Sequence, residues 1–225
     1  MKVKLIICTT LSMVFGLSFA CAQADTIECH SSSRTNPCSG TSGADRIFGS
    51  EGEDFIHGLA GPDEIDGEAG RDSLGGGAGR DLISAGPGRD YLQGGSQNDF
   101  LDGYPDGVRD TFKGGEGGSD LFYFDTTEDG PDLILDFNEG GATPGDFVRI
   151  LNLTTGQLQA TYSNSIEAGD PGVKNVNGDL VIDFTPVSGS GSYTLTFTGL
   201  GGQSLAVGAD LAGSIPYPPL TRGRR

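Results

Sequence analysis

The sequence predicts an all-β fold assembled from short stacked repeats rather than one globular core. Between Gly40 and Asp102 the chain repeats every nine residues over seven consecutive units, each with an aspartate in sixth place and an aliphatic residue in eighth. Of the 225 residues, 39 are glycine, none is tryptophan and only 35% are hydrophobic, too little apolar matter for a large conventional core. A fixed short period with one large apolar residue per unit is typical of stacked repeats.

Each unit has the pattern of a tight turn followed by a short strand. Glycines in first and fourth place suit the close-packed or left-handed backbone of a turn. The three residues after each aspartate place one apolar residue between two that are usually polar, which suits a strand with one inward side chain. Because such a strand cannot bury its single Ile or Leu alone, neighbouring units must stack.

Stacking would bring the aspartates together in columns. If two units form one coil, residues 18 apart lie above one another at a spacing of roughly 4.8 Å. Two unscreened carboxylates this close repel by about 1 kcal/mol in water and by several times that near a protein surface, so each column needs a cation. One column contains Asp45, Asp63, Asp81 and Asp99, and the other contains Asp54, Asp72 and Asp90.

Calcium is the cation that these columns favour. The ligands on offer are carboxylate and turn carbonyl oxygens without interleaved His or Cys, which suits Ca²⁺ better than zinc or copper. Magnesium is the weaker candidate because it demands stricter octahedral geometry. Several Ca²⁺ ions are expected, and the predicted ligands are Asp45, Asp54, Asp63, Asp72, Asp81, Asp90, Asp99 and Asp110.

At these residues the chain resembles the RTX, or haemolysin-type calcium-binding, repeat family, whose units follow Gly-Gly-x-Gly-x-Asp-x-U-x with U a large apolar residue. The resemblance implies a right-handed parallel β-roll with a β-rich C-terminal cap. It also implies that turn carbonyls, such as those of residues 76–80, share calcium with the sixth-place aspartates. Within the seven regular units, only Gly76-Gly77 and Gly94-Gly95 keep both leading glycines, while Ala85 replaces a first-place glycine and Gln97 a fourth-place one.

Beyond Asp102 the period loosens. Two segments look like enlarged units, with Asp110 before Phe112 and Asp120 before Phe122, and residues 129–137 resemble the segment that closes RTX arrays. Asp110, Asp120 and Asp132 are second-rank calcium candidates, and for Asp120 and Asp132 a structural turn role is an equal alternative. Farther on, residues 180–184 and 193–198 alternate apolar and polar side chains across a Gly/Ser-rich turn, which predicts a hairpin.

Five regions follow from these patterns. Residues 1–24 resemble a secretory signal peptide, with Lys2 and Lys4, an apolar stretch and an Ala-x-Ala cleavage site; a membrane anchor, or a lipoprotein joined through Cys21, are the alternatives. Cys29 and Cys38 predict a disulfide in an exported chain, with a metal site as the alternative. The regions are residues 1–24 (signal), 25–39 (N-terminal segment), 40–137 (calcium-binding roll), 138–213 (β cap) and 214–225 (tail).

These observations predict a secreted or extracellular calcium-binding protein that folds on binding calcium, with the periplasm and the cell surface as alternative locations. A net charge of −17 argues against nucleic acid and anionic membranes as partners. No His-Glu-x-x-His or Gly-x-Ser-x-Gly motif occurs, so no enzyme is expected. The alternative is a calcium-stabilised adhesin or polysaccharide-binding module that contacts a glycan or cell surface through outward residues such as Arg46, Phe55, Tyr91 and Phe100.

Overall fold

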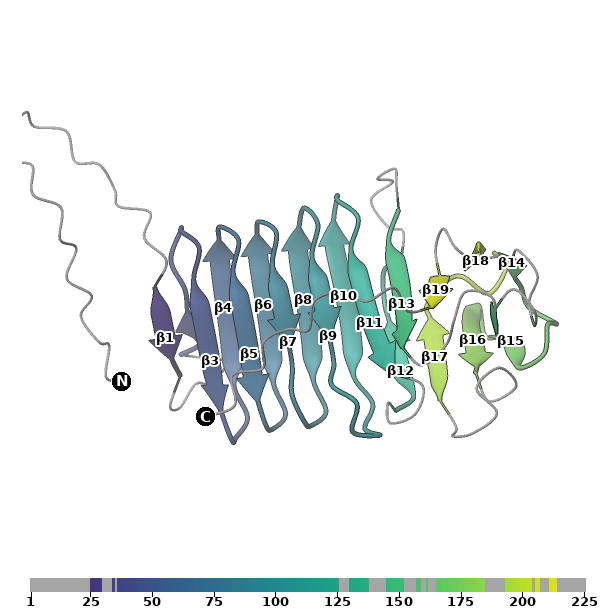
Figure 1. The fold of residues 1–225 in the computed structure, drawn as a ribbon, viewed down its shortest axis with the longest axis horizontal. Helices are drawn as coiled ribbons and strands as arrows, with labels where there is room; N and C mark the ends of the chain where they lie inside the picture. Colours follow the sequence, from purple (N-terminus) through teal and green to yellow (C-terminus); the bar gives the residue numbers. More distant parts are fainter. Residues whose placement is uncertain are drawn as a thin grey trace, which may run out of the picture.

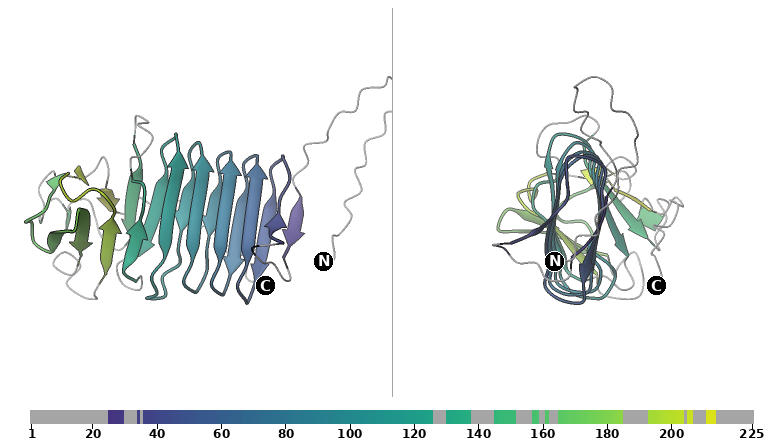
Figure 2. Two further views of the ribbon diagram at one scale, coloured as in Figure 1. Left: turned by 180° about the vertical axis from the view of Figure 1, so that it is seen from behind. Right: turned by 90° about the vertical axis from the view of Figure 1, so that its left-hand side faces the viewer.

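The chain folds as a parallel β-solenoid (Figure 1). Viewed along its axis, the coils superimpose as a flattened ring with two facing sheets (Figure 2). The predicted all-β stacked roll is therefore confirmed. The computed structural model describes residues 25–29, 34, 36–125, 130–137, 145–151, 157–158, 161, 165–184, 193–203, 205–206 and 211–213, so the predicted signal peptide and C-terminal tail lie outside the described residues.

Within the described residues, one sheet contains the odd-numbered strands of the repeat region. These strands pair in parallel and follow one another in chain order, and β19 is the last strand of the sheet, beside β13. In spatial order the strands are β1 (Thr26–Glu28), β3 (Arg46–Ser50), β5 (Glu64–Glu68), β7 (Leu82–Ser84), β9 (Phe100–Asp102), β11 (Leu121–Asp125), β13 (Phe147–Leu151) and β19 (Leu211–Gly213).

The facing sheet, called the even-numbered sheet below, contains the even-numbered strands of the repeat region and ends in an antiparallel part that includes two odd-numbered strands. In spatial order its strands are β2 (Cys38–Ser39), β4 (Phe55–Ala60), β6 (Ser73–Ala78), β8 (Tyr91–Ser96), β10 (Thr111–Glu116), β12 (Asp132–Ile134), β17 (Thr194–Phe197), β16 (Asp179–Asp183) and β15 (Val173–Val176). A small antiparallel pair, β14 (Ser165–Ile166) with β18 (Leu205–Ala206), lies beside this end.

The register confirms that two units form one coil. Ile47 pairs with Ile65 in one sheet, and Ile56 pairs with Leu74 in the other, each 18 residues apart. The eighth-place side chains consequently stack into one aliphatic ladder per sheet, and each is at most 1% exposed. Burying one such side chain contributes roughly 1.5–3 kcal/mol, and only the neighbouring coils can provide that burial.

Most strands of the regular units are longer than the predicted three residues, whereas β7 and β9 have that length. β4, for example, continues through Gly58 and Leu59 to Ala60. Along this strand side chains alternate between outside and inside, and Gly58 takes the inward position after Ile56. A Cβ on Gly58 would collide with Oδ2 of Asp63, so the glycine lets a strand run past the carboxylate of the following turn.

The predicted C-terminal hairpin is confirmed as β16 and β17. Leu180 lies opposite Phe197 in the antiparallel register, and β17 then pairs in parallel with β12, so the hairpin extends the even-numbered sheet. The core between β10 and β11 is aromatic, and the ring centroids of Phe112 and Phe124 lie 5.0 Å apart. This β-rich cap covers the last coil. No helix among the described residues is long and apolar enough to span a membrane.

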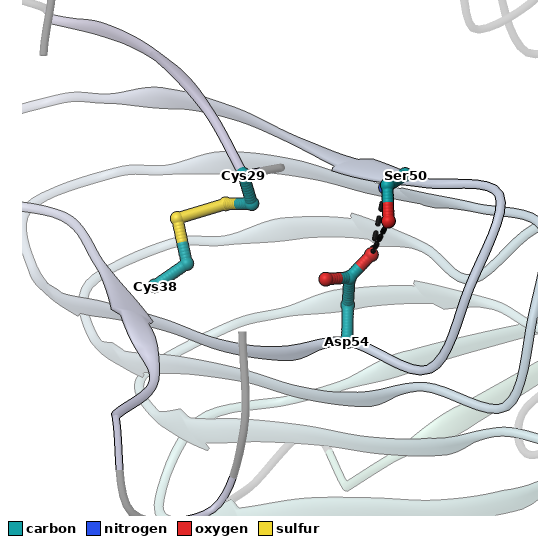
Figure 3. The surroundings of a disulfide bond; sticks show 4 residues. All are labelled: Cys29, Cys38, Ser50 and Asp54. Atoms are coloured by element: carbon teal, nitrogen blue, oxygen red, sulfur yellow. Dashed lines mark hydrogen bonds between the residues drawn. A yellow bond between two sulfur atoms is a disulfide. The ribbon is translucent and has the colours of Figure 1, made fainter. Parts of the chain in front are cut away.

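The predicted disulfide is also present and joins the two sheets at the N-terminal end (Figure 3). Cys29 follows β1 and Cys38 begins β2, with their Cα atoms 5.9 Å apart. The N–H of Cys29 donates a 2.8 Å hydrogen bond to the carbonyl of Phe48, which fastens this end to the first full coil. A disulfide of this kind typically contributes about 2–4 kcal/mol.

Candidate metal centre

The sixth-place aspartates lie in two buried columns, one at each edge of the flattened coil. Each carboxylate comes at the end of a turn, directly before a strand, and the 18-residue register sets it above its counterpart in the next coil. None of these side chains is more than 3% exposed: Asp45, Asp54, Asp63, Asp72, Asp81, Asp90 and Asp99. The structure thus brings the residues together in the two columns that the sequence predicts.

From Asp63 onward, one oxygen of each carboxylate joins neighbouring coils. The N–H of Asp63 donates a 2.9 Å hydrogen bond to Oδ1 of Asp81, and the N–H of Asp72 donates a 2.7 Å bond to Oδ1 of Asp90. The same bond recurs in both columns wherever one coil follows another. Since a charged acceptor strengthens a hydrogen bond, this ladder fixes each carboxylate in place.

The hydrogen bonding of the other oxygen, Oδ2, differs between the first two turns and the later ones. Oδ2 of Asp45 accepts bonds from the N–H and hydroxyl of Thr41, and Oδ2 of Asp54 accepts the equivalent pair from Ser50 (Figure 3). In the following turns the second position holds no hydroxyl. There the buried Oδ2 has no hydrogen-bond partner, and this holds for Asp63, Asp72, Asp81, Asp90 and Asp99.

Burial without a partner makes these carboxyl groups weak acids in the metal-free protein. Desolvation raises the pKa of Asp63, Asp81 and Asp90 to about 6 and that of Asp72 to about 7, against the backbone hydrogen bond that lowers it. The pKa of Asp99 rises to about 8, again mainly through desolvation, with repulsion from Asp81 and Asp120 adding to it. A cation beside Oδ2 would supply the missing compensation for the charged form.

The turn glycines bring backbone oxygens close to these carboxylates. A Cβ on Gly67 would lie 2.8 Å from Oδ2 of Asp72, so the space beside that oxygen is kept free of side chains. The carbonyl of Gly43 points along the axis, where a Cβ on Gly61 would lie 2.5 Å from it. Within the described residues, no hydrogen bond ends on the carbonyl oxygens of Gly43 or Gly61.

Side chains alone do not form a complete metal site here. Among the described residues, no three His, Cys, Asp or Glu side chains converge on a common point. A cation in these turns would therefore take one or two carboxylate oxygens and draw the rest of its ligands from backbone carbonyls. This oxygen-only donor set fits Ca²⁺, which accepts six to eight oxygens in flexible geometry.

Comparison with known families agrees with this geometry. Residues 39–74 and 75–106 match the family described as RTX calcium-binding nonapeptide repeat (4 copies). The chain carries RTX calcium-binding repeats. The matched RTX segments contain all seven regular units and the turns that hold the two columns. A search of curated proteins found no match.

Beyond the matched RTX segments, the columns continue through the enlarged units. The N–H of Asp90 donates to Oδ1 of Asp110, 20 residues on, and the N–H of Asp110 donates to Oδ1 of Asp132, 22 residues on. In the other column the N–H of Asp99 donates to Oδ1 of Asp120. The second-rank candidates therefore align with the regular RTX aspartates. Burial raises the pKa of Asp110 to about 9, with repulsion from Asp132 and Asp90 adding to the shift.

Three acidic residues of the site were not predicted from the sequence. Asp146 extends its column, because its Oδ1 accepts a 3.0 Å bond from the N–H of Asp120 across 26 residues. Asp136 accepts bonds from the N–H groups of Gly114 and Gly115, at 2.8 and 2.9 Å. Asp106 accepts a 2.7 Å bond from the N–H of Gly88. Variable spacing after Asp102 hides all three, and no nine-residue pattern could have found them.

Proposed function

We propose that this RTX protein is exported and folds into its β-roll on binding several Ca²⁺ ions, which occupy the two aspartate columns. The observation that supports the proposal is the run of five buried Oδ2 atoms without hydrogen-bond partners, at Asp63, Asp72, Asp81, Asp90 and Asp99. A buried charge without compensation is costly, and burying such charges in successive coils is costlier still. The roll then depends on a cation that only a calcium-rich environment supplies.

Calcium, when bound, supplies positive charge between stacked carboxylates; the chain supplies the positions of its oxygens. Oδ1 is held by the inter-coil hydrogen bond, so Oδ2 is the oxygen left to bind the ion. First-place glycines keep the approach to Oδ2 open, and fourth-place carbonyls offer further oxygens. Because these positions exist only once coils have stacked, calcium binding adds directly to the free energy of folding.

The eight predicted ligands are expected to contribute unequally. Asp63, Asp72, Asp81, Asp90 and Asp99 offer a free Oδ2, whereas hydroxyl and N–H groups of Thr41 and Ser50 already bind that atom in Asp45 and Asp54. We expect the interior turns to bind calcium more tightly than these two N-terminal turns. Asp110 is expected to act as a ligand of the first enlarged turn, since its carboxyl group is buried and desolvation raises its pKa to about 9.

The export part of the proposal is supported by the disulfide. Disulfides persist in oxidising compartments and are rare in the cytosol, and Cys29 and Cys38 are bonded across the N-terminal end of the roll. Calcium sites in extracellular modules typically bind at about 10⁻⁴ to 10⁻³ M. A chain with such sites would stay largely unfolded at low calcium and fold after export.

Calorimetric titration of residues 25–225 with calcium tests this function. Asp63→Asn with Asp81→Asn keeps an Oδ1 acceptor in both turns and removes two charges from one column, so affinity and stoichiometry should fall. Asp66→Asn is the matched control, because Asp66 ends the same repeat as Asp63 and, among the described residues, accepts only the nearby N–H of Glu68. Equal titrations for the double variant and the control would contradict the proposed ligands.

A further inference from the structure

A column of arginines follows one edge of the roll beside the aspartates of the even-numbered sheet. Fifth-place residues of these turns are Glu53, Arg71, Arg89 and Arg109, in an otherwise strongly acidic protein. The bridge between Gly70 and Gly88 sets Arg71 and Arg89 on adjacent coils, one inter-strand spacing of roughly 4.8 Å apart. Both of these arginine side chains are exposed.

The arginines border a groove with aromatic side chains on its floor. Its volume is about 420 Å³, and it runs over the start of the even-numbered strands, where Phe55, Ser73 and Tyr91 stack in successive coils. At one end the guanidinium carbon of Arg34 lies 5.4 Å from the centroid of the Phe55 ring. Three guanidinium groups and two half-buried rings thus line one continuous surface.

Balancing the buried aspartates does not explain this arrangement. The opposite edge carries the same aspartate column, yet its fifth-place residues are Ala44, Pro62, Arg80, Asn98 and Ser119. Within the described part of the chain, neither Arg71 nor Arg89 forms an ion pair, whereas Arg46 pairs with Glu64 at 2.7 Å on the other sheet. Arg109 differs again, since its Nε donates a 2.8 Å hydrogen bond to the carbonyl of Pro131.

We propose that this groove binds a linear acidic polysaccharide, with Arg34, Arg71 and Arg89 contacting its carboxylate or sulfate groups and Phe55 and Tyr91 contacting the sugar rings. Guanidinium groups bind carboxylates and tetrahedral oxyanions through paired hydrogen bonds, and flat rings add apolar contact at low entropic cost. A regular column of arginines suits a polymer whose charges also recur. A nucleic acid is also a linear polyanion, so the test includes an oligonucleotide, and tight binding of that probe would overturn the proposal.

Binding at this groove depends on calcium in a second way besides folding. Asp72 and Asp90 also line the groove, and Glu53 lies at one end of it. An anionic polymer could approach only when bound cations neutralise the two buried carboxylates. The inference therefore rests on the proposed calcium-dependent function, and it predicts that polysaccharide and calcium strengthen each other's binding.

The test measures equilibrium binding by residues 25–225 in millimolar calcium. The probes are a short oligouronate, dextran sulfate, neutral dextran and a single-stranded oligonucleotide. Both acidic glycans, or one of them, should bind, and neutral dextran should not. Arg89→Gln should weaken binding about tenfold, and Arg71→Gln with Arg89→Gln should weaken it further. Arg80→Gln is the matched control, since it removes the same charge from the same Gly-Arg-Asp sequence on the opposite edge.

Several results would overturn the groove assignment. These are equal weakening by Arg80→Gln and Arg89→Gln, equal binding of neutral dextran, an oligonucleotide that binds as tightly as the glycans, or no binding of any acidic glycan by calcium-folded protein. Far-ultraviolet circular dichroism of each variant checks the fold. Arg89→Lys keeps the charge without the paired hydrogen bonds and should bind several-fold more weakly if Arg89→Gln proves unstable. A wild-type chain that ignores calcium would instead contradict the proposed function.

Discussion

The main-chain N–H of Asp45 donates a 2.8 Å hydrogen bond to Oδ1 of Asp63, one coil farther along. Each sixth-place aspartate therefore has two separable tasks. Its Oδ1 holds the preceding coil, and its Oδ2 is left for a cation where no hydroxyl reaches it. Asparagine preserves the first task and removes the charge needed for the second, which makes Asp→Asn substitutions a sharp probe of the columns.

Asp99→Asn should change stability in opposite directions with and without calcium. In calcium-free protein, it removes a buried carboxylate whose pKa desolvation raises to about 8, so a larger fraction of the variant than of wild type should be folded. In excess calcium it removes a ligand, so the variant should melt at a lower temperature than wild type. Circular dichroism without calcium and thermal denaturation with calcium check this, and a change of stability of the same sign in both conditions would contradict the assigned role of Oδ2.

Calcium-free protein should be more stable in mild acid than at neutral pH. The folded-state pKa values of Asp63, Asp72, Asp81, Asp90 and Asp99 are raised from 3.8 to between about 6 and about 8. Groups with a raised folded-state pKa contribute stability that is fully present below the unfolded value and is lost as pH rises through the folded value. Stability should therefore fall between about pH 4 and pH 8.

The folded fraction of metal-free protein, measured by circular dichroism across that pH range, checks this dependence. In saturating calcium the slope should reverse, because protons then compete with the bound ion. A calcium-free stability that rises towards neutral pH would show that the buried carboxylates are compensated by something other than a cation.

Gly61→Ala should destabilise the roll by about 1–3 kcal/mol. Gly61 has a positive φ of 103°, and an added Cβ would meet the carbonyl of Gly43 at 2.5 Å. Gly52→Ala is the matched control, because Gly52 has the same fourth place but its nearest neighbour, Oγ of Ser50, is 4.0 Å from the added Cβ. Calcium-dependent melting should separate the two variants, and equal stability would contradict the close stacking of fourth-place turns.

Ile83→Ala should cost about 2–5 kcal/mol of stability measured in calcium. Ile83 is fully buried between Ile65 and Leu101 of the neighbouring coils. Leu82→Ala, at the adjacent half-buried outward position, should cost much less. Comparable losses in denaturant titrations would mean that the coils do not bury their apolar residues in the register described.

The nine-residue period predicted the features that repeat. The nine-residue spacing predicted that residues 18 apart lie in parallel register, and this register predicted the aspartate columns and the aliphatic ladders. The Cys29–Cys38 bond and the β16–β17 hairpin also followed from local patterns. The different roles of Oδ1 and Oδ2 could not be predicted, because they depend on whether the hydroxyl of Thr41 or Ser50 reaches the carboxylate in the folded chain.

Features without a local signal were missed. Asp146 joins its column 26 residues after Asp120, not 18, so no fixed period points to it. Likewise, β17 extends the sheet beside β12 through a pairing of Leu133 with Thr196, residues far apart in the chain. Asp106 and Asp136 accept N–H bonds within irregular turns, where side chains stand in for the backbone acceptors of the regular coils.

Circular dichroism of chelator-washed residues 25–225 during addition of calcium tests the central claim most directly. Stacked carboxylates with a free Oδ2 should keep the metal-free chain largely unfolded at neutral pH, and millimolar calcium should produce a cooperative change to a β spectrum. Asp72→Ala with Asp90→Ala should weaken that response more than Asp132→Ala. A β spectrum already complete without calcium, and unchanged by it, would contradict the account.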